Sequence, residues 1–242
     1  MKTMNTIRLL KTVSICLITG YFSIFSTAQA GTIKNSVHDF SSGTYVNGTT
    51  YTWNTTGEIC VVCHTPHASD ETVALAPLWN HEVTASTFTM YDSGTSSPSF
   101  DGTTEAVTNG VSVLCLSCHD GSVAIDSFGG ATGGDLIGAT GASRNIGESV
   151  ATVGNLKNDH PISFVYTESA TDSGMFDSTT AVTIGSGTRT NTGTIASEML
   201  SGGKVQCTSC HDVHNNYVNA ENHKLLKISM TASALCLTCH NK

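Results

Sequence analysis

Residues 60–67 read C-V-V-C-H-T-P-H, and the C-x-x-C-H pattern inside this stretch occurs four times along the chain. The other three copies lie at residues 115–119, 207–211 and 236–240. The chain has nine cysteines, and only Cys16 stands outside the pattern. The repeated motif therefore accounts for every cysteine after residue 30, and it decides what kind of fold the chain can form.

The motif has the spacing that covalent attachment of haem c requires. Two thiols three positions apart lie on one helical turn and reach the two vinyl groups of one porphyrin as thioethers. The histidine that follows directs its imidazole at the iron from the same face. We therefore expect four haem c groups, with attachment residues Cys60, Cys63, Cys115, Cys118, Cys207, Cys210, Cys236 and Cys239. The expected proximal iron ligands are His64, His119, His211 and His240.

Three other uses of paired cysteines compete with haem attachment. Two C-x-x-C pairs could form an all-thiolate zinc site, and one pair could be a redox-active dithiol. Secreted proteins also use paired cysteines for disulfides. None of these uses needs a histidine directly after the second cysteine in all four copies. The sequence therefore favours haem attachment over all three.

Six further histidines are candidates for the second axial position of the irons. His67 and His214 each follow a proximal histidine by three positions. A side chain at that spacing cannot reach round to the opposite face of the same haem, so we expect each of the two to bind a neighbouring iron. The two haems must then lie nearly in contact. The alternative is that both histidines only hydrogen-bond to haem propionates or to solvent.

His160 is a third candidate, because residues 160–164 read H-P-I-S-F. The proline restricts the backbone, and the Ile and Phe side chains suit packing against a ring. On spacing alone His38 is open, since it lies close to the expected mature N-terminus and chain ends are often poorly ordered. His81 and His223 are spare candidates. No methionine has a comparable setting, so we expect His/His ligation.

Six candidates for four vacant positions are enough to close every iron. A closed iron favours electron transfer over catalysis, because a catalytic haem keeps an open axial position. We therefore expect an electron carrier and not an enzyme. The alternative from another class is a multihaem reductase that acts on a nitrogen or sulfur oxyanion, and it would need a five-coordinate haem.

Residues 1–30 have the features of a secretory signal peptide. Three basic residues precede a mostly apolar stretch at residues 12–25, and residues 28–30 read A-Q-A, so we expect cleavage after Ala30. The apolar stretch is too short to be a transmembrane helix. We therefore expect an exported protein with no transmembrane segment in its mature chain, located in the periplasm, on the outer membrane or outside the cell.

Loss of the signal peptide also changes the charge. It removes three basic residues and no acidic one, so the formal net charge falls from −8 to −11. A charge of this sign argues against nucleic acid or anionic lipid as partners.

The composition predicts a fold with little regular structure. Only 7% of the residues are aromatic, so large side chains for a conventional core are few and haem must supply buried apolar surface. We expect a mostly irregular, loop-rich, haem-cored chain with short helices and a few short strands. The expected regions are a haem pair at 31–128, a Gly/Ser/Thr-rich middle at 129–203 and a haem pair at 204–242. A strand is expected at 181–184, a helical turn at 197–200 and another helix from Thr231 into the last motif.

The residues around the motifs resemble those of the doubled-CXXCH multihaem cytochromes. The matching stretches are 60–67, 76–80 (A-P-L-W-N), 115–121 (C-L-S-C-H-D-G), 160–164 and 235–242 (L-C-L-T-C-H-N-K). The resemblance covers nearly the whole mature chain. It is strongest to the small tetrahaem members, some of which polymerise into extracellular cytochrome filaments, or nanowires.

The resemblance implies bis-histidine haems in a continuous stack and export to or beyond the outer membrane. It also implies that the distal ligands are His38, His67, His160 and His214, with His81 and His223 left as spares. The partners would be other redox proteins or copies of the same chain. A filament could use His38 on an N-terminal arm to ligate a haem of the next subunit. The runner-up is a soluble periplasmic electron shuttle with the same haems.

Overall fold

The structure is a computed structural model. It describes residues 33–41, 53–72, 76, 78–91, 104–107, 110–137, 146, 154–166, 174–186, 189–217 and 224–241. The expected signal peptide and the spare candidate His223 lie outside these residues. Within them, no helix is long and apolar enough to cross a membrane.

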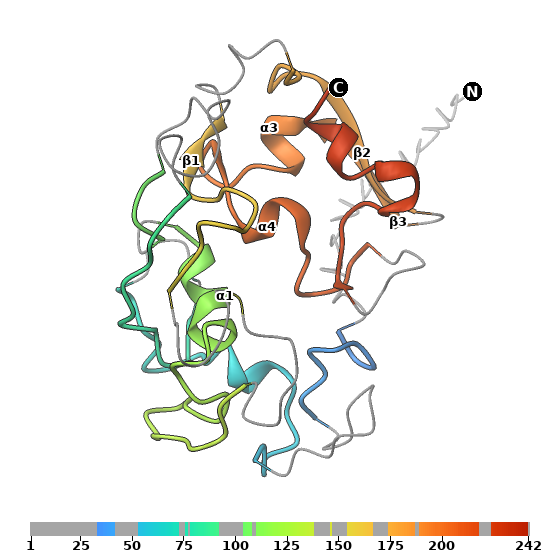
Figure 1. The fold of residues 1–242 in the computed structure, drawn as a ribbon. Coiled ribbons are helices and arrows are strands. Elements are labelled where there is room, and N and C mark those ends of the chain that lie inside the picture. The colour runs from blue at the N-terminus through green and yellow to red at the C-terminus, as the bar shows by residue number, and fades with distance from the viewer. Residues whose placement is uncertain are drawn as a thin grey trace, which may run out of the picture.

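Regular elements are short and sparse in the part of the chain that the structure describes (Figure 1). The helices are η1 (Cys60–Val62), α1 (Ser112–His119), α3 (Ile195–Glu198), α4 (Cys207–Cys210), η4 (Thr231–Ser233) and η5 (Cys236–Thr238). The strands are β1 (Phe164–Val165), β2 (Ala181–Ser186), β3 (Arg189–Thr194) and β4 (Lys204–Val205). The expectation of a loop-rich chain with short helices and few short strands is confirmed.

Each C-x-x-C-H motif coincides with a helical turn. In the first motif the backbone N–H of His64 donates to the carbonyl of Cys60 at 2.8 Å. The corresponding bonds run from His211 to Cys207 at 3.1 Å and from His240 to Cys236 at 2.9 Å. In the second motif the turn is the last part of α1. Because residues three apart share one face of a helical turn, this closure places both thiols of a motif on the same side.

The longest strands form the hairpin β2–β3, in which Ala181 pairs with Thr194 and Ser186 with Arg189. Val182 and Ile184 on β2 are buried while their neighbours on the strand face outward, which is the alternation expected of a strand with one covered face. The predicted strand at 181–184 is therefore confirmed and extends to Ser186.

Two helical predictions need adjustment. The turn expected at 197–200 begins at Ile195, because the Thr194 hydroxyl accepts from the Ser197 N–H at 3.2 Å and caps the helix. The helix expected from Thr231 into the last motif is broken into η4 and η5. Ala232 has a φ of 52° inside η4, a left-handed conformation that no continuous α-helix can include.

The apolar core has two clusters. The larger one joins β2, α3 and β4 to the C-terminal motif and consists of Phe164, Tyr166, Val182, Ile184, Ile195, Met199, Val205, Leu226 and Leu235. The smaller one surrounds α1 and consists of Val107, Val113, Leu116 and Leu156. The Gly/Ser/Thr-rich middle of the chain thus packs onto the third and fourth motifs.

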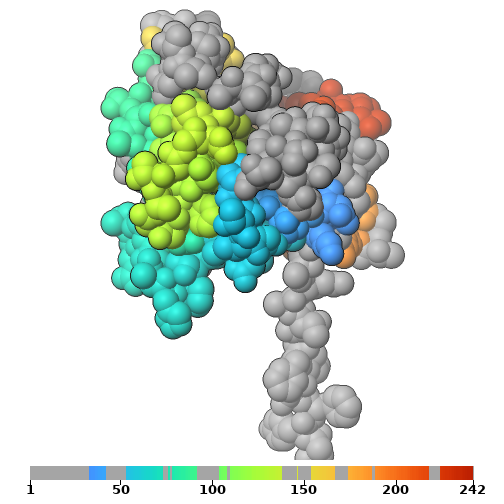
Figure 2. Space-filling view, turned by 90° about the horizontal axis from the view of Figure 1, so that it is seen from below, coloured from blue at the N-terminus to red at the C-terminus, as the bar shows by residue number. Residues whose placement is uncertain are grey.

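Near the first motif the chain is held by aromatic and backbone contacts. Figure 2 shows residues 53–72 beside residues 121–137. The rings of Trp53 and Phe128 make an edge contact here with centroids 6.1 Å apart. In the same region the N–H of Gly129 donates to the carbonyl of Asn80 at 3.1 Å. These contacts attach the first motif to the segment that follows α1.

Candidate haem sites

The eight motif cysteines are all free thiols. Among the described residues, no group of three or more His, Cys, Asp or Glu side chains is placed to share one metal ion. The described geometry thus contains neither the disulfides nor the clustered zinc ligands that would compete with haem attachment. Free thiols, paired on one side of a helical turn, are what thioether attachment needs.

Three pairs of histidine rings lie at nearly the same separation, with planes 21°, 49° and 74° apart. The ring centroids of His64 and His214 lie 6.2 Å apart. Those of His38 and His119 also lie 6.2 Å apart. The centroids of the third pair, His160 and His240, are 6.4 Å apart. Each pair joins one motif histidine to one histidine outside the motifs.

This separation fits a metal ion between the rings. Two imidazoles on opposite sides of one ion, each with its nitrogen about 2 Å from the metal and its centre about 1 Å further, have centroids about 6 Å apart. The three pairs therefore have the spacing that bis-histidine haem iron requires. These histidines, together with the motif cysteines, fit haem c.

His38 is positioned by the segment that follows the third motif. Its ring hydrogen-bonds to the backbone of Val213. Burial, followed by the charges of His119, His211 and His214, lowers the pKa of His38 to about 4. The ring is thus neutral at ordinary pH, which is the form that binds metal, and the Val213 contact fixes its orientation.

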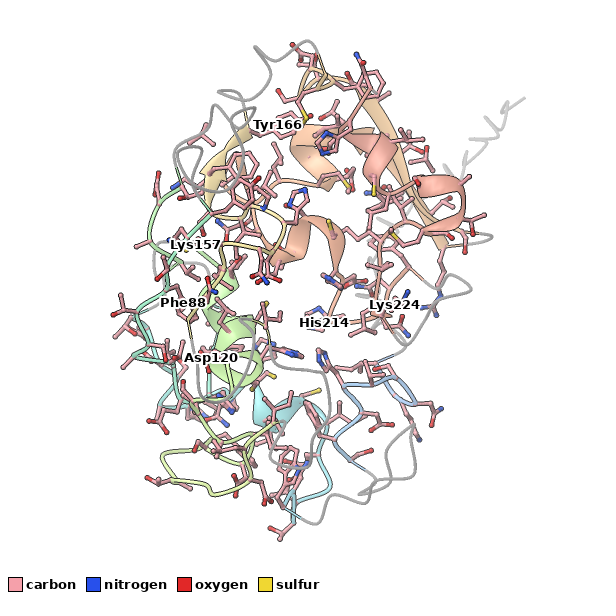
Figure 3. All side chains as sticks on the ribbon, viewed as in Figure 1. Phe88, Asp120, Lys157, Tyr166, His214 and Lys224 are labelled. Carbon is pink, nitrogen blue, oxygen red and sulfur yellow. The ribbon has the colours of Figure 1, made fainter. Side chains whose placement is uncertain are left out.

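Carbonyl oxygens orient two other rings. His160 Nδ1 lies 2.9 Å from the carbonyl oxygen of Pro161. His211 Nδ1 lies 2.8 Å from that of Lys224. A carbonyl can only accept, so Nδ1 carries the proton in both rings, and Nε2 keeps the lone pair that a metal needs. In Figure 3 His214 projects from the segment after α4, close to the N-terminal residues.

Within the described ranges, three of the four expected distal ligands lie next to a motif histidine, and the fourth does not. The structure places His38, His160 and His214 each opposite a motif histidine. His67 is exposed, and among the described residues neither His67 nor His211 makes a ring contact with another histidine. The expectation that His214 approaches the site of another motif fits this geometry, since its partner belongs to the first motif.

The spare candidate His81 has a different environment. It is 2% exposed, and its Nδ1 lies 2.8 Å from the carbonyl oxygen of Glu82. Its Nε2 lies 3.5 Å from the Cys118 sulfur. Both ring nitrogens therefore have partners other than a facing imidazole, and the ring flanks the second motif.

The sulfurs of successive motifs are neighbours. Burial, and then the nearby Cys63 thiol, raise the pKa of Cys118 to about 12. A hydrogen bond from Cys115, its largest influence, lowers the pKa of Cys207 to about 7. Burial, and then Cys239, raise the pKa of Cys210 to about 11. These sulfurs become thioethers when haem is attached, so the contacts matter for position: the second motif lies beside the first and the third, and the fourth lies beside the third.

Sequence reasoning missed the residues that join the motifs. Asn80 donates from its side chain to the carbonyl of Val61 at 2.5 Å and from its backbone to that of Cys63 at 3.0 Å, which ties the first motif to residues 78–81. Ser112 and Gln206 connect the second motif to the third. Asn80 belongs to the stretch that carried the family resemblance, whereas nothing in the sequence pointed to Gln206.

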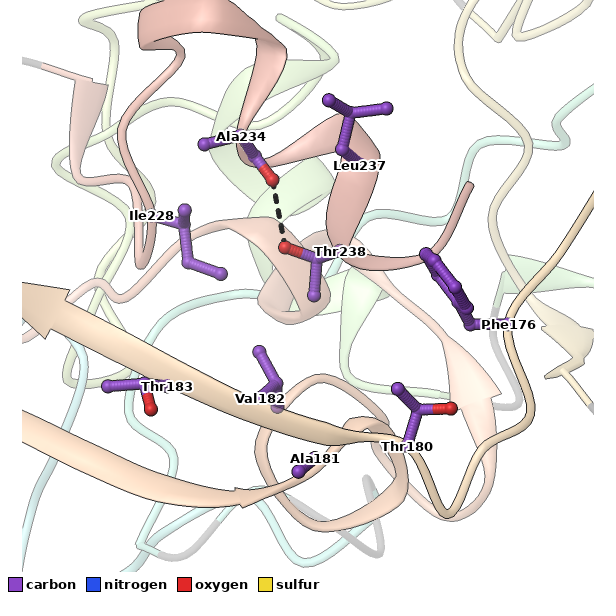
Figure 4. A pocket seen from close by; sticks show the side chains of 9 residues that line it. All are labelled: Phe176, Thr180, Ala181, Val182, Thr183, Ile228, Ala234, Leu237 and Thr238. Atoms are coloured by element: carbon purple, nitrogen blue, oxygen red, sulfur yellow. Dashed lines mark hydrogen bonds between the residues drawn. The ribbon is translucent and has the colours of Figure 1, made fainter. Parts of the chain in front are cut away.

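A groove of about 380 Å³ runs beside the fourth motif, between β2 and η5 (Figure 4). Its lining includes Phe176, Val182, Ile228 and Leu237 and contains no cysteine or histidine. The Thr238 hydroxyl donates to the carbonyl of Ala234 at 3.0 Å along its wall. The groove is therefore separate from the facing histidine rings.

Comparison with known families identifies the C-terminal part of the chain. The model of the doubled CXXCH motif matches residues 200–242, which contain the third and fourth motifs. The match supports a multihaem c-type cytochrome, with covalently bound haem c and a role in electron transfer. No curated protein matches the chain.

Proposed function

We propose that this chain is a tetrahaem electron-transfer protein whose four bis-histidine haems form one continuous path. The observation that carries the proposal is the set of three imidazole pairs at 6.2 to 6.4 Å, each made of one motif histidine and one other histidine. Bis-histidine ligation by one motif histidine and one other histidine needs this composition in each pair.

The three pairs support a set of ligands for three haems, which we propose as follows. The first haem takes His64 and His214, the second takes His119 and His38, and the fourth takes His240 and His160. In this assignment His38 serves a haem of its own chain, because it faces His119. On attachment, each thiol would add its S–H across one vinyl group of the haem. The sulfur would bond to one vinyl carbon and the hydrogen to the other, so no atom is lost.

The matching spacing of the first and third motifs suggests the distal ligand of the third haem. His214, three residues after the proximal histidine of the third motif, faces the proximal histidine of the first. The first motif has the same spacing, so His67 is the equivalent side chain for the third haem, opposite His211. Both rings are exposed. His211 already has its Nδ1 engaged with a carbonyl, which leaves Nε2 for the iron.

The exposure of the cysteines supports a path with two accessible ends. Cys60 in the first motif and Cys236 in the fourth are exposed, and the other six attachment cysteines are half-buried. Electrons can therefore enter at the first haem and leave at the fourth, or the reverse. When bound, haem supplies one-electron chemistry through its Fe(III)/Fe(II) couple. With every axial position filled, the chain carries electrons and does not reduce an oxyanion itself.

The location and assembly form part of the same proposal. The signal peptide supports export of a mature chain beginning at residue 31, and the resemblance to small tetrahaem cytochromes supports an extracellular conduit, assembled from copies of the chain. The alternative is a soluble periplasmic shuttle with the same haems, whose partners are other redox proteins. Size-exclusion chromatography and negative-stain imaging of secreted protein separate the two: filaments support the conduit, and a monodisperse monomer supports the shuttle.

The electron-transfer proposal is tested on the holoprotein. A pyridine haemochrome assay should give four haem c per chain, and the oxidised protein should contain only low-spin iron. Fewer than four haems, or a high-spin iron in the intact protein, would contradict the assignment and favour an open catalytic site.

A further inference from the structure

The second and third motifs meet at a buried polar junction. The Gln206 Oε1 atom accepts from the Ser112 hydroxyl at 2.5 Å and from the Ser112 N–H at 3.3 Å. The Ser112 hydroxyl oxygen in turn accepts from the Cys207 N–H at 3.0 Å. These bonds join the first residue of α1 to the first residue of α4, so the N-termini of the two motif helices lie next to each other (Figure 1).

The junction is inaccessible to solvent. Ser112 is 0% exposed, Gln206 2% and Ser209 4%. Ser209 fixes the Gln206 backbone, because its hydroxyl accepts from the Gln206 N–H at 2.9 Å. The Gln206 amide also lies directly over Gly110, where an added Cβ would come within 2.6 Å of Nε2. A buried donor that loses its acceptor cannot turn to water, so these bonds constrain the two helices strongly.

The consequence for the haems follows from the attachment residues. Cys115 and Cys207, one from each motif, are close enough for their thiols to hydrogen-bond. Each sulfur is bonded to the edge of its porphyrin once haem is attached. With haem attached, the edges of the second and third haems would then lie side by side. Electron transfer falls steeply with the distance between cofactor edges, so this contact would set the rate of transfer between these two haems.

We propose that Gln206 is the positioning residue for the contact between the second and third haems. It does not touch an iron and acts through Ser112 and the ends of the two motif helices. The inference rests on the proposed function, because it presupposes haem on both motifs. Its specific content is that the acceptor oxygen of Gln206 sets the geometry between these haems.

The test compares four forms of the haem-loaded protein. Gln206→Met keeps the length of the side chain and removes the acceptor oxygen, whereas Gln206→Glu retains an acceptor oxygen. Glu105→Gln is the matched control, since Glu105 forms a partly exposed ion pair at 2.6 Å with Lys204, which lies in β4 just before Gln206. The readout is the exciton couplet in the Soret circular dichroism, which reports the relative orientation and distance of neighbouring porphyrins.

We expect Gln206→Met to lose the contribution of the contact between the second and third haems, while Gln206→Glu and Glu105→Gln keep the full couplet. An unchanged couplet in Gln206→Met, whatever its thermal stability, would overturn the inference, as would equal loss in Glu105→Gln. Haem content is measured first in the unaltered protein. If that protein lacks four haems, the proposed function fails; if it has them and the Met variant is unchanged, only this inference fails.

A second variant covers the case in which Gln206→Met fails to accumulate. Ser112→Ala removes the donor and makes a smaller change in volume. It should reduce the couplet in the same way, and the double variant should lose no more than either single one, since both remove one shared interaction. An additive loss would show that the two residues act separately and would contradict the proposal.

Discussion

The imidazole rings of His64 and His214 face each other with centroids 6.2 Å apart and planes 21° apart. One belongs to the first C-x-x-C-H motif and the other follows the histidine of the third motif by three residues. The pair therefore brings together two parts of the chain that are 150 residues apart in the sequence. Several expected outcomes depend on this and the two similar pairs.

Removing His214 should open one iron. In a His214→Ala variant the first haem loses its distal ligand, and we expect one of four haems to change from low spin to high spin, measured by low-temperature EPR. The matched control is His81→Ala, which removes a buried histidine that faces no motif histidine. All four haems of the control should stay low-spin, and a high-spin signal there would contradict the ligand assignment.

Removing His67 tests the reciprocal ligand of the third haem. We expect His67→Ala to give one high-spin haem, as we expect for His214→Ala. Each variant removes the distal ligand of a different iron. The His67→Ala/His214→Ala double variant should then show two high-spin haems. If His67→Ala remains entirely low-spin, the third iron has another ligand and the reciprocal assignment is wrong.

Much of the local chemistry was predictable from sequence. The cysteine and histidine spacing predicts each attachment turn, because i and i+3 fall on one side of a helical turn whatever the rest of the chain does. The alternation at residues 181–184 likewise predicts a strand. The doubled-motif resemblance is confirmed for residues 200–242 by the family match.

The pairings between distant residues were not predictable. Spacing predicts that His214 lies near a haem other than its own but does not select His64, because that choice depends on how the third motif lies relative to the first. The Ser112–Gln206 bond joins residues 94 positions apart and leaves no local pattern. The break at Ala232 is also a tertiary effect, since alanine is the strongest helix former and the segment still adopts a left-handed residue.

Haem is expected to be required for folding. The two apolar clusters are small and separate. Chain 31–242 produced without haem attachment should therefore show no cooperative thermal transition by circular dichroism. Small metal-dependent domains likewise stay unfolded without their metal. A cooperative transition in the haem-free chain would show that the apolar clusters suffice.

The larger apolar cluster should still contribute measurably in the haem-loaded protein. Ile184 is 1% exposed, so Ile184→Ala should lower the free energy of unfolding by about 2 to 4 kcal/mol through lost burial and a residual cavity. Thr183 lies next to it on the exposed side of β2, and Thr183→Ala should change the value by about 0.5 kcal/mol or less. Guanidinium titration followed by far-ultraviolet circular dichroism makes the comparison, and equal losses would contradict the core assignment.

The mature form can be checked by intact mass. We expect secreted protein to have the mass of residues 31–242 plus four haems, because cleavage follows Ala30 and each motif binds one haem by adding its thiols without losing atoms. A mass that includes residues 1–30 would contradict processing. A mass lower by one or more haems would show how many motifs lack haem.

The most direct test of the central claim is the low-temperature EPR spectrum of the oxidised, haem-loaded protein, with the iron quantified against a pyridine haemochrome assay. Four bis-histidine haems predict four low-spin irons per chain and no high-spin signal. A high-spin component in the unaltered protein, or a haem count below four, would contradict the continuous bis-histidine path.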